Sequence, residues 1–200
     1  VMKDAVGKVL AFKKGKKTPK EPIMLCAHMD EVGFCIKHVN DDGTLLFDAI
    51  GVNASVLPSK RVKIGKEKIP GVIASSPVHL SKKTSDLRIS DLYIDVGAQN
   101  LLEASMLFGH YAVFDTDFCM FGDGFVKSKA LDDRIGCTIL CELTKEKPKY
   151  DTFYVFSSGE EIGGGGARAA THRIKPDVCL VLESTTASDI YGNMGADKGC

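Results

Sequence analysis

The stretch Ile23-Met-Leu-Cys-Ala-His28-Met-Asp30 decides the fold, because five apolar residues lead directly into ionisable side chains. A continuous apolar run of this length is typical of a strand buried on both faces of a sheet. His28 and Asp30 follow at its carboxyl end, two residues apart, so their side chains lie on the same side of an extended chain. The stretch therefore predicts a central strand with polar chemistry at one end.

Two later segments repeat this arrangement. Residues 152–156 are β-branched and aromatic and lead into Glu160-Glu161, and the apolar run 178–182 leads into Glu183. Both runs are predicted to be buried strands.

Helices are predicted between these strands. One covers 167–174, and another follows Asp132 with one apolar face. That face is made of Ile135, Ile139, Leu140 and Leu143. Strands that alternate with helices predict an α/β fold with a mostly parallel sheet and flanking helices.

Residues 37–115 have a different character, since short β-like pieces alternate with turn signals such as Asn40-Asp-Asp-Gly43. One short helix is expected over 100–108, with Asn100 as its N-cap and Gly109 as its end. We expect a small, mostly β insert over 37–115, which interrupts an α/β domain formed by 1–36 and 116–200.

The composition excludes several classes of partner. Lys+Arg and Asp+Glu both number 26, so the formal net charge of zero gives no electrostatic argument for nucleic acid or an anionic membrane. No apolar run reaches the roughly 18–20 residues of a membrane-spanning helix. The seven cysteines are odd in number and form no C-x-x-C, which predicts a reducing, cytoplasmic environment. Cys137 and Cys141 could share a helix face, but no other soft ligand accompanies them for a thiolate metal site.

The ionisable residues that follow the strands, or lie at strand-to-helix turns, are His28, Asp30, Asp132, Asp133, Glu160, Glu161 and Glu183. In an open α/β sheet such residues meet at the carboxyl edge. So many carboxylates would repel one another unless divalent cations neutralised them. Mixed imidazole and carboxylate ligands suit Zn²⁺, Co²⁺ or Mn²⁺ better than Ca²⁺.

Neighbouring residues in these motifs are expected to have different roles. Asp30 can orient the imidazole of His28, as carboxylates do beside zinc-bound histidines. Glu160 and Glu161 cannot both point the same way from an extended segment, so one can bind metal while the other acts as a base.

Four motifs resemble, in order and spacing, the TET and glutamyl-aminopeptidase family of clan MH, some of whose members carry the name endoglucanase. They are His28-Met-Asp30-Glu-Val-Gly33, Lys129-Ala-Leu-Asp132-Asp-Arg134-Ile-Gly136, Glu160-Glu161-Ile-Gly163 and Glu183-Ser-Thr-Thr-Ala-Ser-Asp189. The resemblance covers nearly the whole chain. It implies a zinc-exopeptidase-like fold and a two-metal aminopeptidase. It also implies an insert that forms dimers, which assemble into larger hollow particles.

The resemblance also implies a role for each residue. His28 would bind one metal ion, oriented by Asp30, and Asp132 would bridge both ions. Glu161 would bind the second ion, and Glu183 would stand where many relatives have an aspartate ligand. Asp133 and Arg134 belong to their motif without an assigned role.

The implied reaction removes N-terminal residues from peptides by means of a water activated between two zinc or cobalt, or manganese, ions. Glu160 would take the proton of this water as the general base.

The chain departs from the family in length. Relatives have a last histidine ligand far downstream and are longer at both ends, so we expect the 200 residues to be a fragment. Asp189 could be structural or could line the site, and the remaining histidines (His38, His79, His110 and His172) are expected to be surface or satisfied polar residues. The preferred N-terminal residue and the order of the oligomer are left open.

Three other functions compete with the aminopeptidase. Gly163–Gly166 between a strand and a helix could cradle a phosphate, but the two preceding glutamates would repel it and no Walker lysine follows. A glycoside hydrolase also needs two carboxylates, yet it explains neither His28 nor Asp132, and the chain has no Trp for a sugar platform. A non-enzymatic assembly protein that kept the fold is the third.

Overall fold

The computed structural model describes residues 1–18, 22–76 and 87–185, which form two compact units. The first, the sheet unit, comprises Val1–Met29, Leu131–Glu160 and the described part of Gly165–Cys200. The second, the barrel unit, comprises the described part of Asp30–Ala130 together with Glu161–Gly164. Its limits lie outside the 37–115 expected for the insert, since it begins at Asp30, extends to Ala130 and includes Glu161–Gly164.

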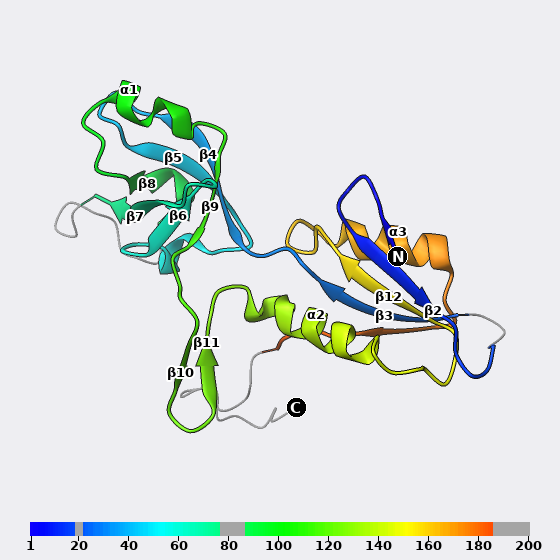
Figure 1. Ribbon diagram of the computed structural model, residues 1–200. Helices are drawn as coiled ribbons and strands as arrows, with labels where there is room; N and C mark the ends of the chain where they lie inside the picture. Colours follow the sequence, from blue (N-terminus) through cyan, green and yellow to red (C-terminus); the bar gives the residue numbers. More distant parts are fainter. Residues whose placement is uncertain (19–21, 77–86, 186–200) are drawn as a thin grey trace. The chain divides into compact units, whose positions relative to one another are not determined.

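A five-stranded sheet forms the centre of the sheet unit, in the spatial order β1-β2-β12-β3-β13 (Figure 1). β3 pairs in parallel with both β12 and β13, whereas β2 is antiparallel to β12 and β1 is antiparallel to β2. The strands are β1 (Met2–Lys3), β2 (Val9–Lys13), β3 (Ile23–His28), β12 (Thr152–Ser157) and β13 (Val178–Val181). The fold is α/β, and the sheet is mixed rather than mostly parallel because β1 and β2 extend it on one side.

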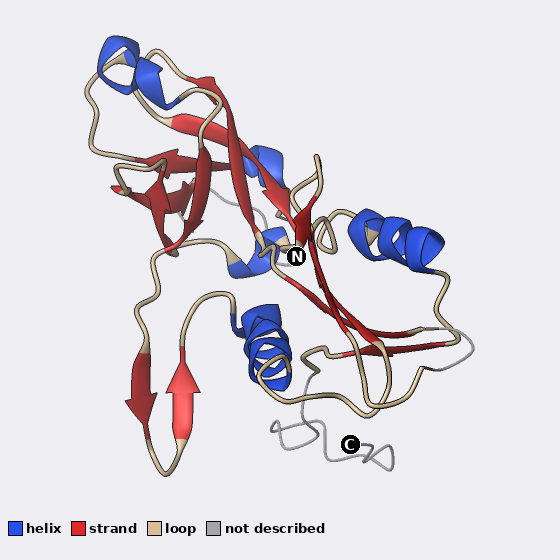
Figure 2. Cartoon of the chain, turned by 45° about the vertical axis from the view of Figure 1, so that its right-hand side comes forward, coloured by secondary structure: helices blue, strands red, loops and turns tan. Residues whose placement is uncertain are grey.

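Two helices cover opposite faces of this sheet, α2 (Leu131–Leu143) and α3 (Gly165–Ile174) (Figure 2). Successive residues of a strand point to opposite faces. Met24 and Cys26 of β3 therefore pack with Ala170 of α3, and Ala27 packs with Leu140 of α2. The expected central strand thus has an apolar layer on each side.

The structure corrects two predictions of burial. Ile135, Ile139 and Leu143 of α2 are exposed in the described chain, whereas the buried face of this helix is Asp133, Gly136, Cys137 and Leu140. Two faces of this helix carry apolar or small residues at helical spacing. The face with the small residues Gly136 and Cys137 lies against β3. All four residues of β13 are exposed, although the apolar run 178–182 predicted a buried strand.

Six strands of the barrel unit close into a barrel, in the order β4-β5-β8-β7-β6-β9. They are β4 (Gly33–Val39), β5 (Leu45–Ile50), β6 (Arg61–Ile64), β7 (Ile69–Ser75), β8 (Leu92–Asp95) and β9 (Tyr111–Phe114). Closure gives each of these six strands a partner on both sides. The barrel encloses a core in which Phe34 makes edge-on contacts with Phe47 and Phe114.

Short elements complete the barrel unit. The expected helix near residue 100 is present as α1 (Leu101–Ala104), followed by a 3-10 turn, η5 (Ser105–Leu107). Asn100 is its N-cap, since its side chain accepts a hydrogen bond from the Glu103 N–H at 3.2 Å. Two further 3-10 turns are η1 (Ala54–Val56) and η4 (Ile89–Asp91), and an exposed hairpin consists of β10 (Cys119–Phe121) and β11 (Phe125–Lys127).

Within the described ranges, no helix is long and apolar enough to cross a membrane.

Candidate metal centre

His28 is the last residue of β3 and is buried, with 3% of its surface exposed. It lies beside Ser157 of the parallel strand β12. The neighbour on the other side, β13, ends at Val181, which pairs with Cys26. The side chain of His28 therefore stands at the carboxyl edge of the sheet, where the ladder between β3 and β13 has ended.

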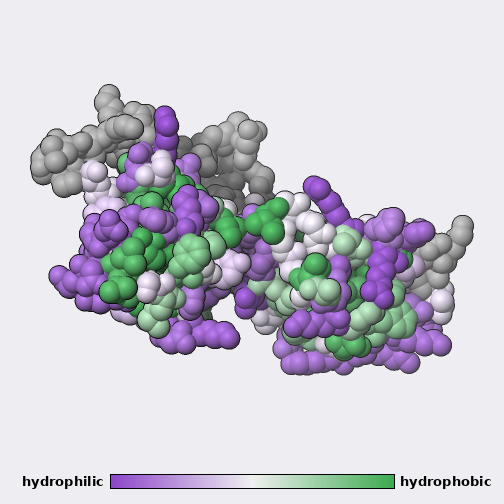
Figure 3. All heavy atoms as spheres, turned by 90° about the horizontal axis from the view of Figure 1, so that it is seen from above, coloured by the Kyte–Doolittle hydropathy of each residue, from purple (hydrophilic) through white to green (hydrophobic). Residues whose placement is uncertain are grey.

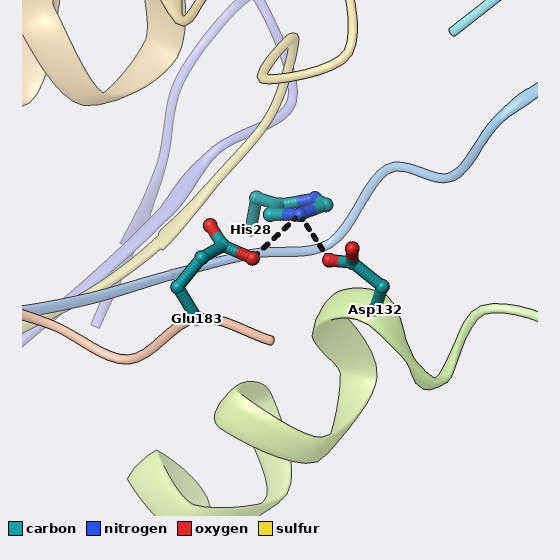
Figure 4. A group of neighbouring side chains, drawn as sticks. All are labelled: His28, Asp132 and Glu183. Atoms are coloured by element: carbon teal, nitrogen blue, oxygen red, sulfur yellow. Dashed lines mark hydrogen bonds and ion pairs between the residues drawn. The ribbon is translucent and has the colours of Figure 1, made fainter. Parts of the chain in front are cut away.

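Two carboxylates reach the imidazole of His28 from different elements (Figure 4). His28 Nε2 lies 3.0 Å from Asp132 Oδ1, which comes from the start of α2. It lies 3.5 Å from Glu183 Oε1, which follows β13. Three sequence motifs that are far apart in the chain thus meet at one point.

The geometry of these three side chains suits a metal ion. One ligand atom from each of His28, Asp132 and Glu183 lies within 4.8 Å of the other two. A tetrahedral ion with bonds of about 2.0–2.2 Å holds its ligand atoms roughly 3.3–3.6 Å apart. The distances around His28 fall close to this range, and one imidazole with two carboxylates is a donor set that zinc, cobalt and manganese accept.

The electrostatics of this group favour a cation. Burial raises the pKa of Glu183 above its ordinary value, and the nearby Asp132 raises it further, although the Ser184 N–H at 3.0 Å acts in the opposite direction. A divalent ion would stabilise both carboxylates in their charged forms.

The other predicted site residues divide between the two units. In the barrel unit, Asp30 Oδ2 accepts a hydrogen bond from the Glu161 N–H at 3.1 Å. Glu160 is exposed and is the last residue of the segment Leu131–Glu160 of the sheet unit. The roles expected for Asp30 and Glu161 depend on contacts between residues of different units, and the role expected for Glu160 depends on a bound ion, so all three roles stay predictions.

Residues 7–199 match the family described as M42 glutamyl aminopeptidase. The chain belongs to this family. It is 31% identical to the glutamyl aminopeptidase of Lactococcus lactis over 207 residues, which cover 95% of this chain and 58% of the relative. The M42 chain thus spans little more than half the length of such relatives.

Solved structures of aminopeptidases have a fold similar to that of this chain. Aminopeptidase APDkam598 from Desulfurococcus kamchatkensis has a TM-score of 0.86 and 36% identity, over 96% of this chain and 55% of its own. The TET1 peptidase of Pyrococcus horikoshii, which can assemble into a tetrahedron or a large octahedral shell, has a TM-score of 0.80 and 27% identity, over 94% of this chain and 61% of its own. The folds agree along almost all of the M42 chain.

The glycine-rich segment of this M42 chain has a structural explanation. Gly163 and Gly164 have positive φ angles of 109° and 71°, which other residues rarely adopt. A Cβ at Gly166 would collide with the Ser158 carbonyl oxygen. The glycines therefore allow a tight turn and a close approach of α3 to the segment after β12, so no phosphate is needed to explain them.

The sequence analysis did not predict that two further residues contact His28. Asp133 and Cys137 are buried and hydrogen-bond to the main chain of His28. Burial raises the pKa of Cys137 to about 11, which opposes thiolate ligation, and Cys141 is exposed. Of the remaining histidines, His38 and His172 are exposed and His110 is partly buried. His79 and Asp189 lie outside the described residues.

Proposed function

We propose that the protein is a metal-dependent aminopeptidase that hydrolyses N-terminal residues from peptides. The convergence of His28, Asp132 and Glu183 at one sheet edge, in a chain of the M42 family, carries the proposal. In this proposal the site holds two divalent ions, zinc or cobalt and alternatively manganese.

We propose the following role for each residue. Bound divalent ions would lower the pKa of a water and polarise the scissile carbonyl group. His28, Asp132 and Glu183 would hold one ion, Asp132 would be shared with a second, and Glu161 would complete the second site. Asp30 would orient His28. Glu160 would accept the proton of the attacking water and donate it to the departing amine.

We further propose that the protein acts in the cytoplasm and forms a homo-oligomer through the barrel unit. The six cysteines that the structure describes are all free, which fits a reducing compartment. The barrel unit exposes several large apolar residues, among them Leu102, Met106 and Phe108. The structurally similar TET1 peptidase of Pyrococcus horikoshii can assemble into a tetrahedron or a large octahedral shell.

The test is hydrolysis of a panel of aminoacyl anilides by the natural full-length protein, after removal of metal with a chelator and restoration of Co²⁺ or Zn²⁺. Glu160→Gln is measured in parallel. We expect turnover only with metal, and a loss of about 100- to 10,000-fold in Glu160→Gln with metal content unchanged. Turnover that persists in the chelated protein, or hydrolysis of a β-glucan after chelation, would contradict the proposal.

A further inference from the structure

The N–H and the carbonyl group of His28 both form hydrogen bonds with residues in the first turns of α2. The His28 N–H donates to Asp133 Oδ2 at 3.1 Å, and the Cys137 thiol donates to the His28 carbonyl oxygen at 3.1 Å. Alternate residues of a strand direct their peptide groups to the same neighbour. The Cys26 carbonyl accepts from the Leu182 N–H. At His28, two residues after Cys26, β13 has ended and provides no partner. Asp133 and Cys137 of α2 bind the peptide groups there instead.

Asp133 is built into this position. Its side chain is fully buried, and its second oxygen, Oδ1, accepts the Gly136 N–H at 3.0 Å. A buried carboxylate is costly unless hydrogen bonds compensate for the lost water. Both oxygens of Asp133 have such bonds, and one of them holds the residue that presents the imidazole.

Gly136 makes room for that carboxylate. A Cβ at this position would stand 2.6 Å from Asp133 Oδ2 and 2.8 Å from its Cγ, closer than real Cβ contacts. Glycine is less favourable than alanine within a helix, so its presence here needs a reason. The close approach of Asp133 explains why this position lacks a side chain.

We propose that Asp133, Gly136 and Cys137 form a clamp that fixes the main chain of His28 relative to Asp132 and thereby sets metal affinity. The inference rests on the proposed metal centre. Asp133 is the chain neighbour of Asp132, so a single dipeptide holds the His28 backbone and supplies the carboxylate 3.0 Å from its imidazole. The three clamp residues are positioning residues, since they act on the ligand and not on the ion or the substrate.

The size of the effect follows from outer-shell partners in other metal sites. Loss of such a partner costs about 10- to 100-fold in metal affinity, because a ligand displaced by about 0.5 Å no longer meets the ion correctly. A clamp residue should therefore affect metal binding even in variants whose fold is intact.

The first experiment compares Cys137→Ala with Cys137→Ser in the full-length protein. Co²⁺ affinity is measured by competition with a chromophoric chelator, together with the Co²⁺ absorption spectrum and the thermal unfolding of the metal-free protein. We expect a loss of about tenfold or more in Cys137→Ala and recovery in Cys137→Ser, because serine keeps a hydrogen donor. Cys141→Ala, one turn away and exposed, is the matched control and should bind like the wild type.

Gly136→Ala is the second variant, chosen because helix propensity and the clamp predict opposite effects. Helix propensity alone predicts that the alanine variant is as stable as the wild type or more stable. Collision of the added methyl group with Asp133 should instead weaken Co²⁺ binding by about tenfold or more and change the Co²⁺ spectrum. Gly165→Ala in α3 is its control, because a Cβ there meets no atom within 4 Å.

Unchanged Co²⁺ affinity in both Cys137→Ala and Gly136→Ala would overturn the clamp. Equal losses in the alanine and serine variants, in parallel with a fall in the melting temperature of the metal-free protein, would also overturn it by showing a merely structural role. The readouts separate this inference from the aminopeptidase proposal. A wild-type protein that binds Co²⁺ but cleaves no peptide would refute the activity, while the ordering of the variants would still support the clamp.

Discussion

At the scale of single residues, the chemistry of this chain concentrates on His28 and the two carboxylates beside it. The sequence predicted His28, Asp132 and Glu183 as members of one site because each follows a strand or begins a helix. The structure brings these three together. The contacts of Asp133 and Cys137 could not be predicted, because they depend on how α2 docks on β3, which no local pattern specifies.

Glu183→Gln tests the contribution of the carboxylate that follows β13 and lies 3.5 Å from His28 Nε2. The amide keeps the shape of the side chain but removes the charge that an ion would neutralise. We expect metal affinity to fall by more than the roughly 10- to 100-fold that an outer partner contributes. Isothermal titration with Zn²⁺ measures it. Glu142→Gln, exposed on α2 and paired with Lys145, is the control, and equal affinity in both variants would refute the assignment.

The cysteines give a second residue-scale prediction. Burial raises the pKa of both Cys26 and Cys137 to about 11, so almost none of either thiol is ionised in the folded protein at pH 8. Cys119 and Cys141 are exposed. Brief alkylation with iodoacetamide at pH 8, followed by peptide mass spectrometry, should label Cys119 and Cys141 first. Labelling of Cys26 and Cys137 at the same rate in the native protein would contradict their burial.

At the scale of elements, the sequence predicted the strands and helices of the sheet unit better than their surroundings. The strands β3, β12 and β13 were evident from apolar runs that end in ionisable residues. The antiparallel strands β1 and β2 were missed because their short segments carry no comparable signal. The prediction of the buried face of α2 was wrong, because it followed the aliphatic residues. The face that lies against β3 contains the small residues Gly136 and Cys137, which allow closer packing.

Gly166→Ala tests the packing of α3 against the segment after β12. The added methyl group would collide with the Ser158 carbonyl oxygen, so we expect a loss of about 1–3 kcal/mol in the free energy of unfolding. Urea denaturation followed by circular dichroism measures it. Gly165→Ala adds the same methyl group in open space and should change stability by less than about 0.5 kcal/mol. Similar values for the two variants would argue against this close approach.

At the scale of the whole molecule, the chain consists of an α/β sheet unit and a closed barrel. The change from helical to β-type patterns indicated a β-rich insert. The limits of the barrel unit were not evident, because its first strand begins directly after the His28 motif. Apolar residues are also visible among polar ones on the surface drawn in Figure 3.

The proposed assembly through the barrel unit makes a prediction at this scale. Leu102 and Met106 lie in and beside α1 and are 82% and 67% exposed. The double variant Leu102→Glu/Met106→Glu should shift the full-length protein to smaller species, because it places two charges in an apolar contact. Light scattering after size exclusion measures the mass. Lys60→Glu, at an exposed polar position of the same unit, is the control, and an unchanged mass in the double variant would exclude this surface from the interface.

The most direct test of the central claim is a Co²⁺ titration of the metal-free, full-length protein. Co²⁺ absorption and aminoacyl-anilide hydrolysis are followed in the same samples, with His28→Ala in parallel. The account predicts that hydrolysis rises with the occupancy of the site and that His28→Ala loses both signals. Full hydrolysis before Co²⁺ is added, or an unchanged Co²⁺ spectrum and activity in His28→Ala, would contradict it.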